Sequence, residues 1–185
     1  IRGAVLNNKA DLGLIFDTDV DRMSAVFSDG QEVNRDALIA MMAAILVKDY
    51  PNSTIVTDSV TSDKLTAFLE GELQLKHHRF QRGYKNVINE CKRLNEEGVV
   101  SPLAIETSGH GALKENYYLD DGAYMAVKLL IAAAKTKAEG KTLNSLIEKL
   151  EPQFETAEYR LKLKGEDFKA YGAKVLEIFT ARAKE

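Results

Sequence analysis

Thr54-Ile55-Val56-Thr57 begins the part of the sequence that decides the fold, because its short apolar centre predicts a buried strand. Leu103-Ala104-Ile105 is a further short strand of the same kind. Between them, apolar residues recur at helical spacing from Tyr84 to Leu94, and the nearly all-apolar run Ala123 to Ala134 follows. Since strands and helices alternate, we expect an α/β fold with a mixed, largely parallel sheet flanked by helices. The uniform hydrophobicity of 123–134 predicts a helix that is buried on most sides.

Two more strands are expected before this layer. Residues 12–16 and 23–27 are apolar runs on either side of an acidic hexapeptide, and Ser28-Asp29-Gly30 closes them with a turn signal. Asn34 then serves as a predicted N-cap for a helix whose apolar residues continue to Leu46 at helical spacing.

The composition changes after Gly140. Thr142 is expected to cap a short helix, residues 158–163 alternate like a half-exposed strand, and the apolar residues between Phe168 and Phe179 predict a last helix. One strand and one helix do not complete a domain, so residues 141–185 are expected to be a linker and an incomplete α+β piece.

Composition restricts the class of protein. The chain has 185 residues, a net charge of −3 and 45% hydrophobic residues, which is typical of a globular protein. We expect no nucleic-acid partner, since no excess of basic residues would neutralise phosphates. No apolar run reaches the roughly 20 residues of a membrane span, so no membrane association is expected either. The single cysteine, Cys91, fits a reducing cytoplasm.

The hexapeptide Asp17-Thr18-Asp19-Val20-Asp21-Arg22 carries the strongest chemical signal. Its carboxylates, Asp17, Asp19 and Asp21, come directly after a strand and repel one another unless a cation lies among them. Hard oxygen ligands favour Mg²⁺. Three acidic residues at alternate positions therefore predict a magnesium site, against the plainer interpretation of a solvated acidic turn.

Two other motifs overlap this hexapeptide. An EF-hand requires glycine at the sixth position and glutamate at the twelfth, where this chain has Arg22 and Ser28, so that interpretation fails. An apolar strand followed by Asp-x-Asp also resembles the nucleophile loop of haloacid-dehalogenase-type phosphatases. Such a phosphatase needs a separate lysine and distal acidic residues; Lys64 and Lys85 are candidates, but neither precedes an acidic cluster. This alternative stays open.

A second polar group is Glu106-Thr107-Ser108-Gly109-His110, at the exit of a predicted strand. A carboxylate, a hydroxyl and an imidazole in this segment can bind the vicinal hydroxyls of a sugar, and Gly109 allows close approach of the backbone. Read alone, the segment is equally typical of a polar turn. Its expected place at the carboxyl end of a strand favours a site.

A third segment, Arg82-Gly83-Tyr84-Lys85-Asn86-Val87, opens a predicted helix. Backbone N–H groups at a helix start, together with Lys85, can hold an anion. Without further information, a glycine turn with solvated cations is the better interpretation. His77 and His78 have no spacing for a metal and are interpreted as surface histidines.

Taken together and in this order, the three motifs resemble the α-D-phosphohexomutases, the phosphoglucomutase/phosphomannomutase family. Lys114-Glu115 and Asp120-Asp121-Gly122 also look like that family's sequence after its sugar loop. The resemblance implies a four-domain enzyme that interconverts hexose 1-phosphate and hexose 6-phosphate through a phosphoserine and a hexose 1,6-bisphosphate intermediate, with glucose and mannose phosphates favoured.

The resemblance also implies residue roles. Asp17, Asp19 and Asp21 would bind Mg²⁺, and Arg22 would contact the phosphoserine or the transferring phosphate. His110 would position the substrate or assist proton transfer. The other expected substrate-binding residues are Gly83, Tyr84, Lys85, Glu106, Ser108 and Lys114.

The resemblance covers part of such an enzyme. It implies that residues 1–30 are the end of domain 2 with the metal loop, 31–140 are the sugar-recognition domain 3, and 141–185 are the linker and the start of domain 4. Thr18 and Ile105 stand where the family usually has glycine, and no phosphoserine loop of the family type is present. We therefore expect the missing domains to be the partners of this chain, and the chain alone to be inactive. A non-catalytic sugar-phosphate-binding domain is the remaining alternative.

Overall fold

The computed structural model describes residues 1–152 and 167–184. It divides into two compact units, Ile1–Gln153 and Phe154–Glu185. The described part of the second unit is helix α6, Phe168–Arg182, in which the Asp167 side chain accepts a hydrogen bond from the Ala170 N–H as an N-cap. The last predicted helix is thereby confirmed, whereas the predicted strand at 158–163 lies outside the described residues. Within the described ranges, no helix combines the length and hydrophobicity that a membrane crossing requires.

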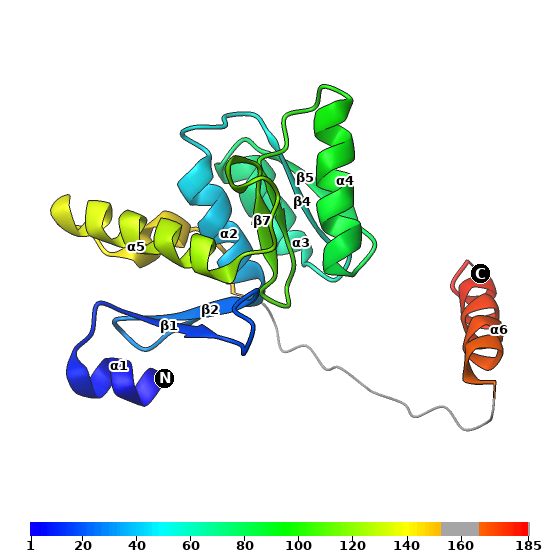
Figure 1. Cartoon of the computed structure of the whole chain (residues 1–185), viewed down its shortest axis with the longest axis horizontal. Helices are drawn as coiled ribbons and strands as arrows, with labels where there is room; N and C mark the ends of the chain where they lie inside the picture. The colour runs from blue at the N-terminus through cyan, green and yellow to red at the C-terminus, as the bar shows by residue number, and fades with distance from the viewer. Residues whose placement is uncertain (153–166, 185) are drawn as a thin grey trace. The chain divides into compact units, whose positions relative to one another are not determined.

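The chain begins with helix α1, Arg2–Asn8, and a small antiparallel sheet (Figure 1). Its strands are β1 (Leu12–Phe16), β2 (Met23–Phe27) and β3 (Glu32–Val33), in that spatial order. Phe16 pairs with Met23, so the acidic hexapeptide forms the connection between β1 and β2. Both predicted strands are confirmed, and the acidic residues are held at the tip of a hairpin.

The central sheet has four strands in the order β5-β4-β6-β7. Strand β4 (Thr54–Asp58) pairs in parallel with β5 (Lys76–Phe80) and with β6 (Leu103–Ile105), while β7 (Gly111–Leu113) returns antiparallel beside β6. The expected mixed, largely parallel sheet is confirmed. Strands β6 and β7 form a tight hairpin, and residues 106–110 are its turn; we call this turn the sugar loop after its predicted role.

Helices cover both faces of this sheet (Figure 1). On one face, Val56, Ala104 and Ala112 pack against α4, Tyr84–Glu96. On the other face, Ile55, Leu103, Ile105 and Leu113 belong to the main hydrophobic core together with residues of α2 and α5. The elements around this second face are α2 (Arg35–Leu46), α3 (Asp63–Ala67), η1 (Phe68–Glu72), α5 (Gly122–Ala138) and η3 (Leu143–Ile147), and η2 (Lys114–Asn116) follows β7.

The prediction that the 123–134 helix is buried on most sides is wrong. Met125 and Leu129 of α5 are buried, but Val127, Leu130 and Ile131 are 51%, 48% and 47% exposed. One side of α5 packs on α2 and on the β1–β2 hairpin, and the opposite side is open. Hydrophobic composition alone does not reveal how many neighbours a helix has.

Two local interpretations also need correction. Asn34 occupies the N-cap position of α2, but its side chain makes no capping bond and donates instead to Glu32 Oε2. His77 is not a plain surface residue: its Nε2 and Nδ1 lie 2.8 Å from the hydroxyls of Thr57 and Thr66, respectively. Burial lowers the pKa of His77 to about 4, which keeps the ring neutral at physiological pH.

Candidate functional site

The acidic loop docks directly on the sugar loop. Arg22 and His110 form an antiparallel bridge, and the Met23 N–H donates to the Gly109 carbonyl at 3.2 Å. The Gly122 N–H, at the start of α5, donates to the Val20 carbonyl at 3.0 Å. Main-chain hydrogen bonds thus join the tip of the β1–β2 hairpin to the β6–β7 turn and to α5.

Two glycines make this close docking possible. Gly109 has φ +98°, and a Cβ atom there would lie 2.8 Å from the Met23 carbonyl oxygen. A Cβ atom on Gly122 would lie 2.9 Å from the Val20 carbonyl oxygen. Any larger residue at either position would therefore push the two loops apart.

The carboxylates of the hexapeptide converge. Asp17, Asp19 and Asp21 each offer an oxygen within 4.8 Å of the others. Asp21 Oδ1 is buried, and no described group donates a hydrogen bond to it. A buried carboxylate oxygen without a donor, beside two further carboxylates, fits a divalent cation with hard oxygen ligands.

Arg22 competes for one of these ligands. Its Nε lies 2.6 Å from Asp17 Oδ2, its backbone N–H donates to Asp17 Oδ1, and its Nε is 3.8 Å from Asp21 Oδ1. Burial acts to raise the pKa of Asp17, but the hydrogen bonds and charge of Arg22 outweigh it and lower the pKa. Both oxygens of Asp17 are engaged by Arg22, so a cation in this loop must share or displace that contact.

Glu106 joins the second and third predicted segments. It is only 5% exposed, and its Oε1 accepts the Gly83 N–H at 2.6 Å while its Oε2 accepts the Ser108 hydroxyl at 3.1 Å. Gly83 has φ +123° and starts α4. The carboxylate therefore fixes the turn at 82–84 relative to the sugar loop, and it leaves Ser108 exposed at the surface of the site.

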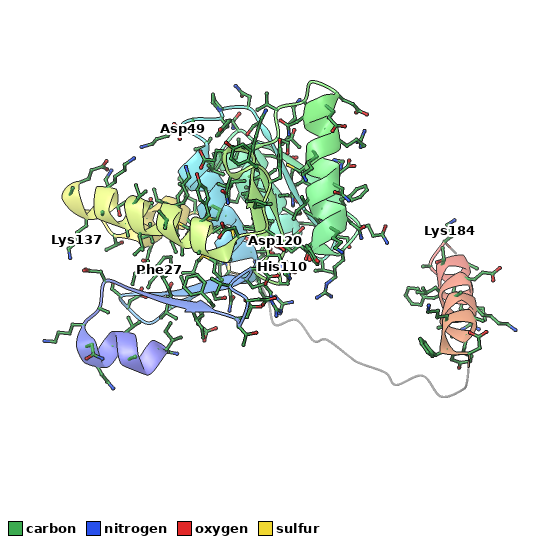
Figure 2. The ribbon with its side chains drawn as sticks, viewed as in Figure 1. Phe27, Asp49, His110, Asp120, Lys137 and Lys184 are labelled. Carbon is green, nitrogen blue, oxygen red and sulfur yellow. The ribbon has the colours of Figure 1, made fainter. Side chains whose placement is uncertain are left out.

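His110 lies at the centre of the group. Tyr84 stacks on its ring, with centroids 4.8 Å apart and planes 18° from parallel. Its Nδ1 is 2.8 Å from Asp120 Oδ2 and 3.6 Å from Asp21 Oδ2. Figure 2 labels His110 and Asp120 side by side, between the β1–β2 hairpin and the α/β layers. The Lys85 ammonium lies over the Tyr84 ring, 5.8 Å from the ring centroid.

The structure does not bring Lys114 to this group. Its Nζ donates to Asn95 Oδ1 at 2.8 Å, and its backbone N–H donates to the carbonyl of Pro102, the residue before β6. Because β7 runs antiparallel to β6, Lys114 lies at the amino end of β6, whereas Glu106 and His110 lie at its carboxyl end. The remaining predicted site residues gather at that carboxyl end.

Sequence reasoning missed two residues of the site. Asp58, fully buried at the end of β4, accepts hydrogen bonds from the Thr107 N–H at 3.3 Å and hydroxyl at 2.7 Å. Asp120, which the sequence analysis names only within the Asp120-Asp121-Gly122 motif and gives no role, contacts His110. The place of Asp58 directly after a buried strand was an available signal, because that is where side chains meet at the edge of a parallel sheet.

A hollow of about 260 Å³ lies beside the docked loops. Its lining combines the acidic loop with the sugar loop and the end of β1: Ile15, Phe16, Asp17, Arg22, Met23, Ser24 and Ser108. A larger hollow of about 640 Å³ lies between the start of α2 and η3 and contains none of the predicted site residues. Three of the predicted site residues, Asp17, Arg22 and Ser108, therefore line the smaller hollow.

Comparison with known proteins places these features in a family. Residues 34–154 match the family model described as phosphoglucomutase/phosphomannomutase, alpha/beta/alpha domain III. A phosphomannomutase/phosphoglucomutase of Pseudomonas putida is 34% identical over 137 residues, covering 72% of this chain and 28% of that protein. A phosphoglucosamine mutase of Lactobacillus acidophilus is 32% identical over 145 residues, covering 77% of this chain and 30% of that protein.

A solved structure of the same family is also similar to this chain. The phosphoglucomutase/phosphomannomutase family protein of Burkholderia thailandensis is 26% identical, with a TM-score of 0.70 over 85% of this chain and 32% of that one. The chain thus spans less than a third of the length of these relatives. Because the family model matches well over half of its residues, the chain belongs to the phosphoglucomutase/phosphomannomutase family, the α-D-phosphohexomutases.

Proposed function

We propose that this chain supplies the metal-binding and sugar-recognition parts of a phosphohexomutase that interconverts hexose 1-phosphate and hexose 6-phosphate. The observation that carries the proposal is the main-chain docking of the acidic loop on the sugar loop, through Met23 and Gly109. If the two loops have the roles proposed here, this docking brings the cation site next to the hexose site. Phosphoryl transfer requires that arrangement, since it depends on positioning and on charge neutralisation.

In this proposal Asp17, Asp19 and Asp21 hold Mg²⁺. When bound, the cation would neutralise charge on the transferring phosphoryl group. Arg22 adds a guanidinium beside the same loop, and release from Asp17 would let it contact a phosphate. The convergence of the carboxylates and the buried Asp21 Oδ1 without a donor support this assignment.

Substrate binding falls to the neighbouring loops. Ser108 is exposed beside the hollow, and Glu106 holds it there while fixing Gly83. Tyr84 stacks on His110, and the Lys85 ammonium lies 5.8 Å from the centroid of the Tyr84 ring. These groups suit the hydroxyls and phosphate of a hexose phosphate, with glucose and mannose favoured, and His110 would take up the proton of the attacking hydroxyl.

The remaining steps depend on residues outside this chain. We propose that a phosphoserine in another domain donates the phosphoryl group, that a hexose 1,6-bisphosphate forms, and that the enzyme works in the cytoplasm. Residues 1–30, 31–140 and 141–185 are then the end of domain 2, domain 3 and the linker with the start of domain 4. The chain alone should not convert glucose 1-phosphate to glucose 6-phosphate.

Calorimetric titration tests the proposal. Mg²⁺ should bind the wild-type chain and should bind Asp19→Ala much more weakly. Asp11→Ala is the matched control, because Asp11 is likewise an exposed aspartate but pairs with Lys137 away from the loop. Glucose 1-phosphate should bind in the presence of Mg²⁺ and lose affinity in Ser108→Ala.

Two outcomes would contradict the proposal. Equal Mg²⁺ binding by wild type and Asp19→Ala would remove the metal site. Hydrolysis of an aryl phosphate by the chain with Mg²⁺ would favour the phosphatase alternative, which the family comparisons do not support.

A further inference from the structure

We infer that Val20 makes the acidic loop selective for Mg²⁺ over a larger divalent cation such as Ca²⁺. The inference rests on the proposed function, because it concerns the cation that Asp17, Asp19 and Asp21 would hold. The observation that carries it is the backbone of Val20. Its φ angle is +63°, in the left-handed region, and it lies between two of the three carboxylates in the sequence.

A valine in this conformation is strained. Left-handed backbone brings the Cβ atom close to the following carbonyl oxygen, and a side chain that branches at Cβ fits there least well. Seven residues other than glycine have positive φ in the described parts of the chain, and Val20 is the one β-branched residue among them. The others are Lys9, Arg35, Asn52, Gln74, Tyr117 and Tyr118. Such strain persists only where the surrounding structure holds the residue in place.

Hydrogen bonds on both sides hold Val20. Its N–H donates to the Asp17 carbonyl at 3.3 Å within the loop, and its carbonyl accepts the N–H of Gly122, at the start of α5, at 3.0 Å. Gly122 approaches so closely that a Cβ atom there would lie 2.9 Å from the Val20 carbonyl oxygen. The backbone at Val20 is therefore fixed between its own loop and α5, although 40% of the residue is exposed.

This fixed backbone sets the spacing of the carboxylates beside it. Asp19 and Asp21 directly precede and follow Val20, and each offers an oxygen within 4.8 Å of the other and of Asp17. The left-handed region is small for every residue except glycine, so the φ and ψ angles of Val20 have little room to change. The distance between the Asp19 and Asp21 carboxylates can therefore change only slightly.

Mg²⁺ and Ca²⁺ differ in what they require from such a loop. Mg²⁺ demands near-ideal octahedral geometry at about 2.0–2.1 Å, whereas Ca²⁺ takes longer bonds of about 2.3–2.6 Å and a more flexible set of oxygens. Neighbouring oxygens around an octahedral ion are then about 3 Å apart for Mg²⁺ and about 3.4 Å apart for Ca²⁺. A loop that cannot widen disfavours the larger cation.

Glycine at position 20 tests this role, because it keeps the backbone conformation accessible and adds freedom. Val20→Gly can hold φ near +63° without strain, and it can also leave that angle. Calorimetric titration of the chain with each cation should show that the ratio of Mg²⁺ to Ca²⁺ affinity falls about two- to fivefold, since Mg²⁺ must order the freed glycine while Ca²⁺ gains from a wider loop. Val20→Ile, which keeps the branch at Cβ, should retain the wild-type ratio.

Asn52→Gly is the matched control. Asn52 also has positive φ, +57°, but lies in the exposed turn before β4, so both affinities should stay unchanged. Measurements without any cation complete the test. The ¹⁵N order parameter of the residue 20 amide should be about 0.85 in wild type, as for rigid backbone, and lower in Val20→Gly. The melting temperature of Val20→Gly should not fall, because the substitution removes strain.

The outcomes separate this inference from the proposed function. An unchanged affinity ratio in Val20→Gly, with Mg²⁺ bound by both proteins, would overturn the role of Val20 and leave the metal site intact. A mobile residue 20 amide in wild type, or a marked fall in the melting temperature of Val20→Gly, would overturn it as well. Failure of the wild-type chain to bind either cation would instead reject the proposed metal site, and the selectivity with it.

Discussion

Replacement of Asp58 should loosen the sugar loop and cost substantial stability. Asp58 is fully buried, and its carboxylate is the acceptor for both the N–H and the hydroxyl of Thr107. Asp58→Ala leaves these two donors of the half-buried Thr107 without their acceptor. At about 1–3 kcal/mol for each unsatisfied donor, the free energy of unfolding should fall by about 2–6 kcal/mol. Asp58→Asn keeps one acceptor and should lose about half as much.

Urea denaturation measures this loss, and calorimetry with glucose 1-phosphate measures its effect on the site. Asp36→Asn is the matched control, since Asp36 is 4% exposed and accepts hydrogen bonds from the N–H and hydroxyl of Ser62, away from the sugar loop. Both asparagine variants should be destabilised, but only Asp58→Asn should also weaken sugar-phosphate binding. A loss below about 1 kcal/mol in Asp58→Ala, or equal weakening of binding in Asp36→Asn, would refute the reasoning.

Three further perturbations test other parts of the structure. Burial lowers the pKa of His77 in the folded chain to about 4. Between pH 4 and the pKa of about 6.5 that His77 has in the unfolded chain, unfolding therefore takes up a proton. The free energy of unfolding should fall, by at most about 3 kcal/mol, as the pH drops from about 6.5 to 4. His77→Gln should remove this dependence in denaturation curves recorded across that range, and an unchanged slope would contradict the assignment. Gly109→Ala should destabilise the chain by about 2 kcal/mol more than Gly98→Ala, because both glycines have positive φ but only a Cβ at 109 meets backbone. Thermal melts that give the two variants equal stability would argue against tight docking of the loops. Arg22→Met should raise the Mg²⁺ affinity about two- to fivefold in calorimetry, because it frees Asp17 from a half-exposed ion pair. Arg22→Lys keeps the charge and should change the affinity less. Weaker Mg²⁺ binding by Arg22→Met would show instead that Arg22 supports the cation site.

Strong periodic patterns made most of the fold predictable. The β1–β2 hairpin, the parallel pairing of β4 with β6, and helices α2 and α4 follow from apolar spacing that tertiary packing leaves unchanged. The orientation of α5 could not be predicted in this way, because an all-apolar helix has no polar face to show which side is open. Strand β7 was missed because its residues include Gly111 and Ala112, and glycine and alanine are depleted in strands.

The site shows the same division. The acidic and sugar loops could be predicted as candidate site segments because their polar residues directly follow short apolar runs. Asp120 and Asp121 are adjacent and chemically alike, so only the backbone geometry reveals that one caps α5 and the other contacts His110. His77 looked exposed because its partners, Thr57 and Thr66, come from separate elements that packing brings together.

The joint between the acidic loop and the sugar loop has an evolutionary consequence. It consists of backbone N–H and carbonyl groups of Met23, Gly109, Val20 and Gly122, which every amino-acid replacement except proline retains. The side chains around it can therefore diverge while the acidic loop keeps its distance from the sugar loop. Under the proposed function, the preference for one hexose can then change without a change in the metal-binding loop, provided that the two glycines persist.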